Sequence, residues 1–371
     1  MTIFLVLVLS AGIAILQSYV FGVFGISRIR YTRRFNVETC YAGDKVELLE
    51  VIENVKPLPV PWLRVESTID ASLRFRTDDR LEIDTGKRTQ YHKSVFSMGP
   101  YRRIRRRHTV TCTKRGVYRL DTVSLIAGDL LGTKENHVQV PIKVKLTVYP
   151  QVMAMEDMPM PSHGWQGDIT VRRWIVEDPF LITGVREYRS GDPMKHIHWK
   201  ATAKTGSLQV YQHDYSAEQR LVVYLNVEDK ETTTDLVTNE AMIEQGISYA
   251  ATLVTDAIHR GINVGFGHNG TNPYDPESSG RLPISGGREH LLAMLTEMAK
   301  LELRCRWRFP AFLEKDLALT GERRDYILIT AHQSEALQAN VRMLQQAGHS
   351  VQLLMLEQQA APSELESEVS A

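Results

Sequence analysis

The densest group of side chains that could do chemistry lies in residues 184–214, GVREYRSGDPMKHIHWKATAKTGSLQVYQHD. A histidine near a carboxylate is the pair that general acid–base catalysis uses, and His198 with Asp192 or Asp214 would supply it. The favoured interpretation is a structural one: a hydrogen-bonded and ionic network at a domain junction, formed by Arg186, Asp192, His198 and Lys200. A third interpretation is a surface that binds an anion or a protein partner, served by Arg189, Lys195, Lys200 and Lys204.

Local signals in the same segment predict a helix over residues 193–204. Asp192 followed by proline is typical of a helix start, and Gly206 of a helix end. On that helix His196 and His198 point about 200° apart, which makes them a poor pair of metal ligands. On a strand they would share a face, and a metal site could then include His213 and Asp214. In the structural interpretation the aromatic rings packed beneath the network are Trp199 and Tyr188.

The chain before this segment is typical of β-structure. Short alternating segments separated by Gly and Pro predict an all-β sandwich of about seven strands over residues 28–152, because each alternating strand buries one face against a second sheet. The clearest strands are 45–55, 61–69, 107–113 and 144–150. Residues 153–214 are then a connecting segment. It contains residues 184–214, which we call the central motif.

The chain after this segment has another period. Apolar runs suited to buried strands are 221–227, 262–267, 325–330 and 350–356. Segments with helical spacing alternate with them, at 239–261, 289–301 and 334–348. This alternation predicts a doubly wound, mostly parallel α/β sheet over 215–357, followed by a disordered tail, 358–371.

An uncharged apolar run occupies residues 3–26. At about 1.5 Å per residue it exceeds the ~30 Å hydrocarbon core of a bilayer, so residues 1–27 are predicted to be a retained transmembrane anchor. A cleaved signal peptide is the alternative. No Lys or Arg precedes the run, and four basic residues follow it: Arg28, Arg30, Arg33 and Arg34. By the positive-inside rule, this asymmetry predicts that the soluble part lies in the cytoplasm. We therefore expect a single-pass protein of the cytoplasmic membrane.

Composition excludes a globally disordered chain, a collagen and a multi-span membrane protein. The chain has 371 residues, with 44 Lys plus Arg against 44 Asp plus Glu, 43% hydrophobic and 24% charged residues, so it is an ordinary globular chain. A formal net charge of zero gives no electrostatic case for a nucleic-acid partner. The basic run 101–110 is interpreted as an exposed edge or hairpin, with anionic lipid headgroups as the second interpretation. The three cysteines are far apart and predict no disulfide scaffold.

The central motif resembles that of the bacterial family called domain of unknown function 58. The matching residues are Arg186, Tyr188, Gly191, Asp192, Ile197, His198, Trp199, Lys200 and Ala203. A second stretch, 113–132, is similar to another family motif through Arg115, Gly116, Tyr118, Asp129 and Gly132. The resemblance implies a membrane-anchored protein with a β-rich domain and a von Willebrand A-like domain. It also implies two partners, a MoxR-type AAA+ ATPase and a membrane transglutaminase-like protein, beside the lipid bilayer.

The metal site of von Willebrand A domains is not expected here. That site uses Asp-x-Ser-x-Ser after the first strand, because short oxygen ligands suit Mg²⁺. This sequence has Asn226, Glu228 and Lys230 at those places, and a lysine ammonium would repel the cation. We therefore predict no metal and no cofactor, although a loose cation site remains open through Glu228, Asp229 and Asp235.

These observations together favour a binding protein. We expect a membrane-anchored adaptor that works with a MoxR-type AAA+ ATPase in assembly or maturation of cell-envelope or other protein complexes, with no catalytic residues. The alternative is a hydrolase or transferase that uses His198 and Asp192 of the central motif. The two interpretations differ in the environment they require for the His198 ring: bonded to protein, or open in a polar pocket.

Overall fold

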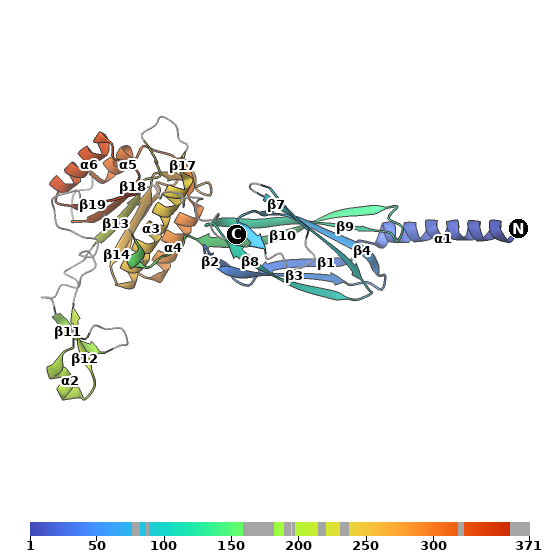
Figure 1. Cartoon of the computed structure of the whole chain (residues 1–371), viewed down its shortest axis with the longest axis horizontal. Helices are drawn as coiled ribbons and strands as arrows, with labels where there is room; N and C mark the ends of the chain where they lie inside the picture. The colour runs from blue at the N-terminus through green and yellow to red at the C-terminus, as the bar shows by residue number, and fades with distance from the viewer. Residues whose placement is uncertain are drawn as a thin grey trace, which may run out of the picture. The chain divides into compact units, whose positions relative to one another are not determined.

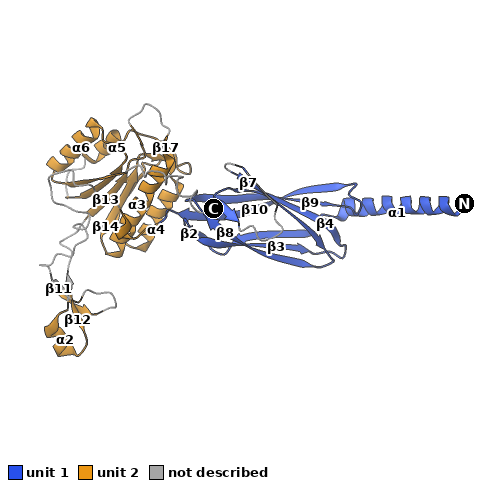
Figure 2. Cartoon of the chain, in the orientation of Figure 1, with its two compact units in different colours: residues 1–151 blue, residues 152–371 orange. Residues whose placement is uncertain are grey.

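The computed structural model describes residues 1–75, 82–86, 89–158, 182–188, 194, 197–213, 220–230, 237–317 and 323–356. The chain divides into two compact units, Met1–Gln151 and Val152–Ala371 (Figure 2). The tail predicted to be disordered, 358–371, lies outside the described residues.

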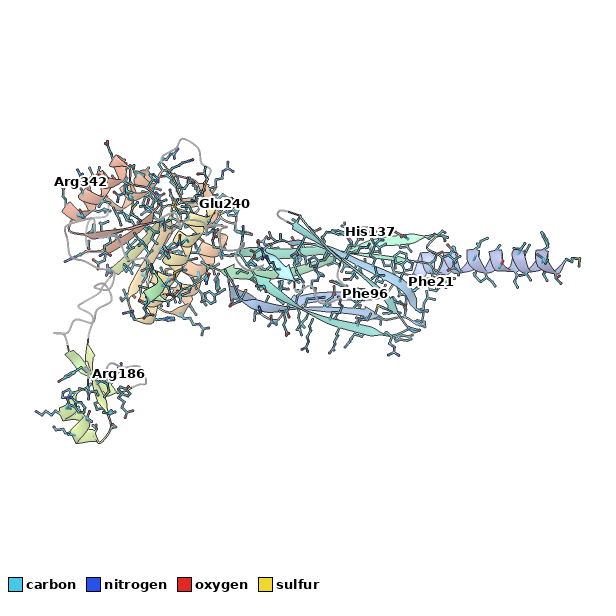
Figure 3. All side chains as sticks on the ribbon, in the orientation of Figure 1. Phe21, Phe96, His137, Arg186, Glu240 and Arg342 are labelled. Atoms are coloured by element: carbon cyan, nitrogen blue, oxygen red, sulfur yellow. The ribbon has the colours of Figure 1, made fainter. Side chains whose placement is uncertain are left out.

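The first unit begins with a long apolar helix, α1 (Thr2–Phe24). Its most apolar 18 residues are not buried inside the protein, and Phe21, near the end of the helix, is its one buried residue. Figure 3 shows its side chains standing free along the helix, with Phe21 at the end that meets the β-strands. Length and composition are therefore those of a membrane span or a signal sequence.

Two β-sheets follow in the same unit (Figure 1). The first has the strand order β1 (Ile29–Phe35), β3 (Lys45–Asn54), β8 (Arg103–Cys112), β5 (Leu73–Phe75). The second has the order β2 (Thr39–Tyr41), β10 (Glu135–Tyr149), β9 (Gly116–Gly128), β4 (Val60–Asp70), β7 (Thr89–Met98), β6 (Glu82–Thr85). The described residues thus form more than the seven strands expected, because β2, β5 and β6 are too short to show alternation in the sequence.

The core of this unit is shared by both sheets. Leu48 and Ile52 of β3 and Leu63 of β4 are fully buried in one hydrophobic cluster. Each such side chain contributes roughly 2 kcal/mol by leaving water. The cluster also brings together two thiols that lie far apart in the sequence, Cys40 of β2 and Cys112 of β8, whose Sγ atoms are 3.6 Å apart. Sequence spacing alone gave no sign of this contact between the sheets.

A charged cluster lies between the same two sheets. Glu50 is 3% exposed and accepts hydrogen bonds from the Tyr31 hydroxyl at 2.5 Å and the Arg33 guanidinium at 3.2 Å, with the His108 ring 3.5 Å away. Burial raises the pKa of Glu50, but these partners outweigh it and hold the pKa at about 2. His92 borders the same small cavity, and burial together with the Arg33 charge lowers its pKa to about 4. Glu50 is thus held ionised and His92 neutral at pH 7.

The His92 pKa predicts how stability depends on pH. Because the pKa of His92 in the folded chain, about 4, is below its ordinary value of 6.5, the unfolded chain binds the extra proton. The stabilisation is complete above pH 6.5 and lost toward pH 4, at a cost of up to about 3 kcal/mol. Urea unfolding of the full chain in detergent, followed by pulse proteolysis from pH 7 to 4.5, should show this loss, and His92→Leu should reduce it. The matched control His137→Leu changes an exposed histidine, and an equal effect there would contradict the assignment.

The second unit contains a mixed sheet in the order β16 (Arg281–Ser285), β14 (Asn263–His268), β13 (Arg220–Leu225), β18 (Asp325–Thr330), β19 (Ser350–Met355). The last four of these strands are parallel, and β16 is antiparallel to β14. A separate short pair joins β15 (Gly270–Thr271) and β17 (Glu302–Cys305). The unit is therefore built around a mostly parallel sheet, as the alternating periods predicted.

Helices pack on both faces of this sheet. One face of β13, through Val222 and Tyr224, packs into a core with α5 (Phe309–Leu317) and α6 (Glu335–Gln346). The other face meets α3 (Glu240–His259), where Gly246 packs closely against the side chains of Leu356 and Leu225. Helix α4 (Arg288–Lys300) packs beside α3. The helices predicted at 239–261, 289–301 and 334–348 are thus confirmed. Helix α5 was not predicted, although Pro310 in its first turn is a usable helix-start signal.

Candidate functional site

Three strands of the mostly parallel sheet end side by side in polar residues. Asn226 follows β13, Asn269 follows β14, and Thr330 ends β18; all three are almost fully buried. The Asn226 amide donates to the Thr330 hydroxyl at 3.0 Å, and the Asn269 amide donates to the Asn226 side-chain oxygen at 3.0 Å. The carboxyl edge of a parallel sheet is where α/β proteins bind ligands. Here its polar side chains join the strands to one another.

The acids at this edge also have partners. Glu228 is 6% exposed and lies 3.4 Å from the Arg308 guanidinium; burial raises its pKa despite that charge. Asp229 accepts hydrogen bonds from the backbone of Thr238 and Asn239 at the start of α3; burial opposes ionisation, but these bonds lower its pKa. The third acid of the loose cation site, Asp235, lies outside the described residues. Within the described ranges no three His, Cys, Asp or Glu side chains converge as metal ligands.

A second polar cluster near this edge, formed by His268, Asn272 and Glu297, was not predicted from the sequence. His268, which ends β14, is fully buried, and its Nε2 lies 3.4 Å from Glu297 of α4. The Asn272 amide donates to both Glu297 oxygens, at 2.9 and 3.1 Å. Burial raises the Glu297 pKa, but these bonds more than compensate and lower it. The amphipathic pattern of α4 does not indicate that Glu297 bonds to His268 and Asn272, so only the tertiary structure shows this contact.

The central motif forms a small separate structure. Strands β11 (Ile182–Glu187) and β12 (Gln209–His213) pair antiparallel, with helix α2 (Trp199–Thr205) between them (Figure 1). The predicted helix over 193–204 is not continuous, because Ile197 makes a β-bridge to Val210 and α2 begins only after it; residue 193 itself lies outside the described residues. The predicted end is confirmed: Gly206 has φ +73° and closes α2.

His198 is the N-cap of α2. Its Nδ1 accepts a hydrogen bond from the Ala201 backbone N–H at 3.1 Å, and its ring packs against Tyr211 with centroids 4.4 Å apart. A ring nitrogen that accepts must be unprotonated, so in the neutral histidine the proton is on Nε2. The structure thus gives His198 a positioning role at the start of the helix.

The other motif residues are not all drawn together. Trp199 is 66% exposed, so the expectation that it packs beneath a polar network is wrong; Tyr188 is half-buried. Lys200 is exposed on α2, and Arg186 donates to the Glu187 carbonyl at 3.1 Å. Several predicted residues lie outside the described residues, namely Arg189, Gly191, Asp192, Lys195, His196 and Asp214.

The second motif shapes the strands of the first unit. The Tyr118 hydroxyl donates to the Lys114 carbonyl at 2.7 Å, across the turn that contains Arg115 and Gly116. Asp129 begins the tight turn between β9 and β10, where it accepts from the Thr133 backbone N–H at 2.7 Å. Gly132 completes that turn with φ +69°, which favours glycine. These residues therefore hold two turns in place.

These features define a mixed α+β protein with one long apolar helix, a two-sheet β-unit and a helix-flanked, mostly parallel sheet. Residues 184–328 match the family model described as protein of unknown function DUF58. The family that the central motif predicted is therefore confirmed as the one whose model these residues match. The second motif, 115–132, precedes the matched region.

One curated relative is the uncharacterized protein YeaD of Bacillus subtilis (strain 168), which is 20% identical over 304 residues. The match covers 80% of this chain and 66% of the relative, so this chain spans just under two thirds of its length.

Solved structures match about a third of the chain. A non-cellulosomal cohesin from Archaeoglobus fulgidus shares 13% identity over 32% of this chain and 91% of its own, with a TM-score of 0.23. The CARDB domain of the PF1109 protein from Pyrococcus furiosus shares 16% over 33% of this chain and 96% of its own, with a TM-score of 0.20. With TM-scores this low, we draw nothing about this chain from them.

The strand-end network predicts a large cost for one substitution. Asn269→Ala removes the acceptor of the Val227 N–H and the amide that donates to Asn226 and to the Trp307 carbonyl. Because buried groups lose their partners, the free energy of unfolding should fall by about 3 kcal/mol. Urea unfolding of the full chain in detergent tests this. Asn263→Ala, on the exposed start of the same strand, should change it by less than about 0.5 kcal/mol; equal losses would argue against the network.

Proposed function

We propose that this protein is a non-enzymatic, membrane-anchored binding protein. It works as an adaptor for a MoxR-type AAA+ ATPase, alongside a membrane transglutaminase-like protein, in assembly or maturation of cell-envelope or other protein complexes. Its partner-binding surface is the hairpin of the central motif, and its mostly parallel sheet belongs to a von Willebrand A-like domain.

The observation that supports this proposal is the exposure of four large apolar side chains on the hairpin. We call the motif patch the four large apolar side chains that β11, α2 and their flanking residues expose: Val185, Met194, Trp199 and Leu208. Met194 and Trp199 are 68% and 66% exposed. Tryptophan is enriched at protein-binding surfaces, where it contributes much of the binding energy. Lys200 and Lys204 of α2 add positive charge, which suits an acidic partner.

The sheet supports a binding role in another way. A von Willebrand A-like domain is compatible with four parallel strands flanked by helices on both faces. At its carboxyl edge Asn226 bonds to Thr330, and Glu228 faces Arg308, so these groups are engaged with the protein. A rigid edge of this kind suits a scaffold whose contacts come from the motif patch.

The enzyme alternative requires His198 as a base. Its Nδ1 already accepts from the Ala201 backbone, so the neutral ring presents a proton at Nε2 instead of a lone pair. Asp192, the other residue of that alternative, lies outside the described residues. The geometry of His198 therefore favours the binding role.

The motif patch predicts a binding defect without a folding defect. Trp199→Ala should reduce ATP-sensitive recovery of the AAA+ ATPase when the membrane-extracted protein is affinity-purified from its host, by at least tenfold for a side chain worth about 2 kcal/mol. Because Trp199 is exposed, the urea midpoint should not change. Tyr274→Ala, at a residue 42% exposed outside the hairpin, is the control. Unchanged recovery by Trp199→Ala would contradict the proposal.

A pair of substitutions at His198 separates positioning from catalysis. Asparagine is a good N-cap and no general base, whereas alanine is neither. His198→Asn should therefore keep partner recovery near that of the unchanged protein, and His198→Ala should weaken it through loss of about 1 kcal/mol of cap energy. A protein in which both substitutions abolish function equally would favour the enzyme alternative.

We further propose that α1 spans the cytoplasmic membrane once, with both units in the cytoplasm. Arg28, Arg30 and Arg34 are exposed beside α1 and supply the positive charge; Arg33 points inward to Glu50 and does not. A protease added to intact spheroplasts should leave the soluble units uncut and should degrade them after lysis. Degradation before lysis would reverse the orientation.

A further inference from the structure

The turn between β9 and β10 exposes two neighbouring leucines. Leu130 and Leu131 are 65% and 63% exposed at its tip, while Asp129 just before them is fully buried. The Asp129 carboxylate accepts hydrogen bonds from the backbone and hydroxyl of Thr133, which fixes the turn. A rigid turn that presents two leucines outward is unfavourable in water and suits an apolar environment.

This turn lies against α1. The Gln17 side chain donates to the Asp129 carboxylate at 3.3 Å and accepts from the Leu130 backbone N–H at 3.2 Å. Ser18 and Thr133 share a hydrogen bond between their hydroxyls at 3.1 Å. Gln17 and Ser18 are polar residues of a mostly apolar helix, and in hydrocarbon such groups need protein partners. The turn supplies them.

The length of α1 sets the depth of this contact. Residues 2 to 16 extend about 22 Å at ~1.5 Å per residue, which is short of the ~30 Å hydrocarbon core. A membrane-spanning α1 must therefore place several residues after Leu16 inside the core, and Gln17 and Ser18 are the first of these. The leucines that adjoin them reach the same depth.

A second level lies farther along the helix. Lys56 donates to the carbonyl oxygens of Phe24, the last residue of α1, and of Ser27 just after it. The Lys56 carbonyl accepts from the Tyr101 backbone N–H. Seven residues separate Gln17 from Phe24, or about 10 Å along the helix. Tyr101, 68% exposed, and the exposed Arg102 thus lie near the level where headgroups begin. Tyrosine and arginine are the residues favoured at that level.

We propose that the end of the β-unit next to α1 is a lipid-binding surface: Leu130 and Leu131 insert among the acyl chains of the leaflet, while Tyr101 and Arg102 contact the headgroups. This inference rests on the proposed membrane span of α1. It makes the β-unit part of the membrane-bound structure and fixes its tilt above the bilayer.

An environment-sensitive fluorophore on single cysteines tests the insertion. The full chain with Cys305→Ser, in which Cys40 and Cys112 are buried, is labelled at Leu131→Cys and reconstituted into vesicles of phosphatidylcholine and phosphatidylglycerol. Val37→Cys, an exposed apolar residue between β1 and β2, is the matched control, and Ile13→Cys reports on α1 itself. Each label is then quenched by iodide in water or by nitroxide on the acyl chains.

The expected result is a blue-shifted label at residue 131, quenched by acyl-chain nitroxide and several-fold less by iodide than the label at 37. Lipid quenching at 13 with an aqueous label at 131 would overturn the insertion and leave the anchor intact. An aqueous label at 13 would overturn both. A label at 131 shielded from iodide and from nitroxide alike would indicate a protein contact in place of lipid, and would also overturn the proposal.

Discussion

The link between α1 and the β-sandwich depends on a buried lysine. Lys56 lies between β3 and β4, is 4% exposed, and its ammonium donates to the carbonyl oxygens of Phe24, Gly25 and Ser27. The last carbonyls of a helix have no partners within it, and a cation there also interacts favourably with the helix dipole. The Val55 backbone N–H, next to Lys56, also donates to the Arg28 carbonyl. The end of α1 therefore cannot shift without leaving several polar groups unpaired. For this reason the turn between β9 and β10 has a defined depth once α1 is placed in a bilayer.

The same requirement to satisfy buried polar groups shapes both units. Between the two sheets Glu50 is held by Arg33 and Tyr31, and at the carboxyl edge of the mostly parallel sheet Asn226 and Asn269 are bonded to each other. These side chains keep a single packing, because a removed partner leaves a costly unpaired group. Because these side chains already bond to other protein groups, they are not presented to a ligand or substrate. The exposed apolar side chains of the motif patch are therefore the better guide to function.

Periodic features were predictable from sequence, and contacts between distant residues were not. The helices α3, α4 and α6 follow from their spacing, because one face of each packs on a sheet. The helix expected over 193–204 is interrupted at Ile197, which makes a β-bridge to Val210, and α2 follows from Trp199. That bridge joins residues 13 positions apart, so the local helix signals gave no sign of it.

The sequence by itself determined the apolar span of α1, the alternation of β-strands and then of strands with helices, and the family motif. These depend on composition and spacing within short windows, where neighbours along the chain are also neighbours in space. Only the tertiary structure decided that Trp199 is exposed, that Arg33 pairs with Glu50, and that Leu130 lies beside Gln17. Each of these depends on residues far apart in sequence, so burial and hydrogen bonding arise only when the chain has folded.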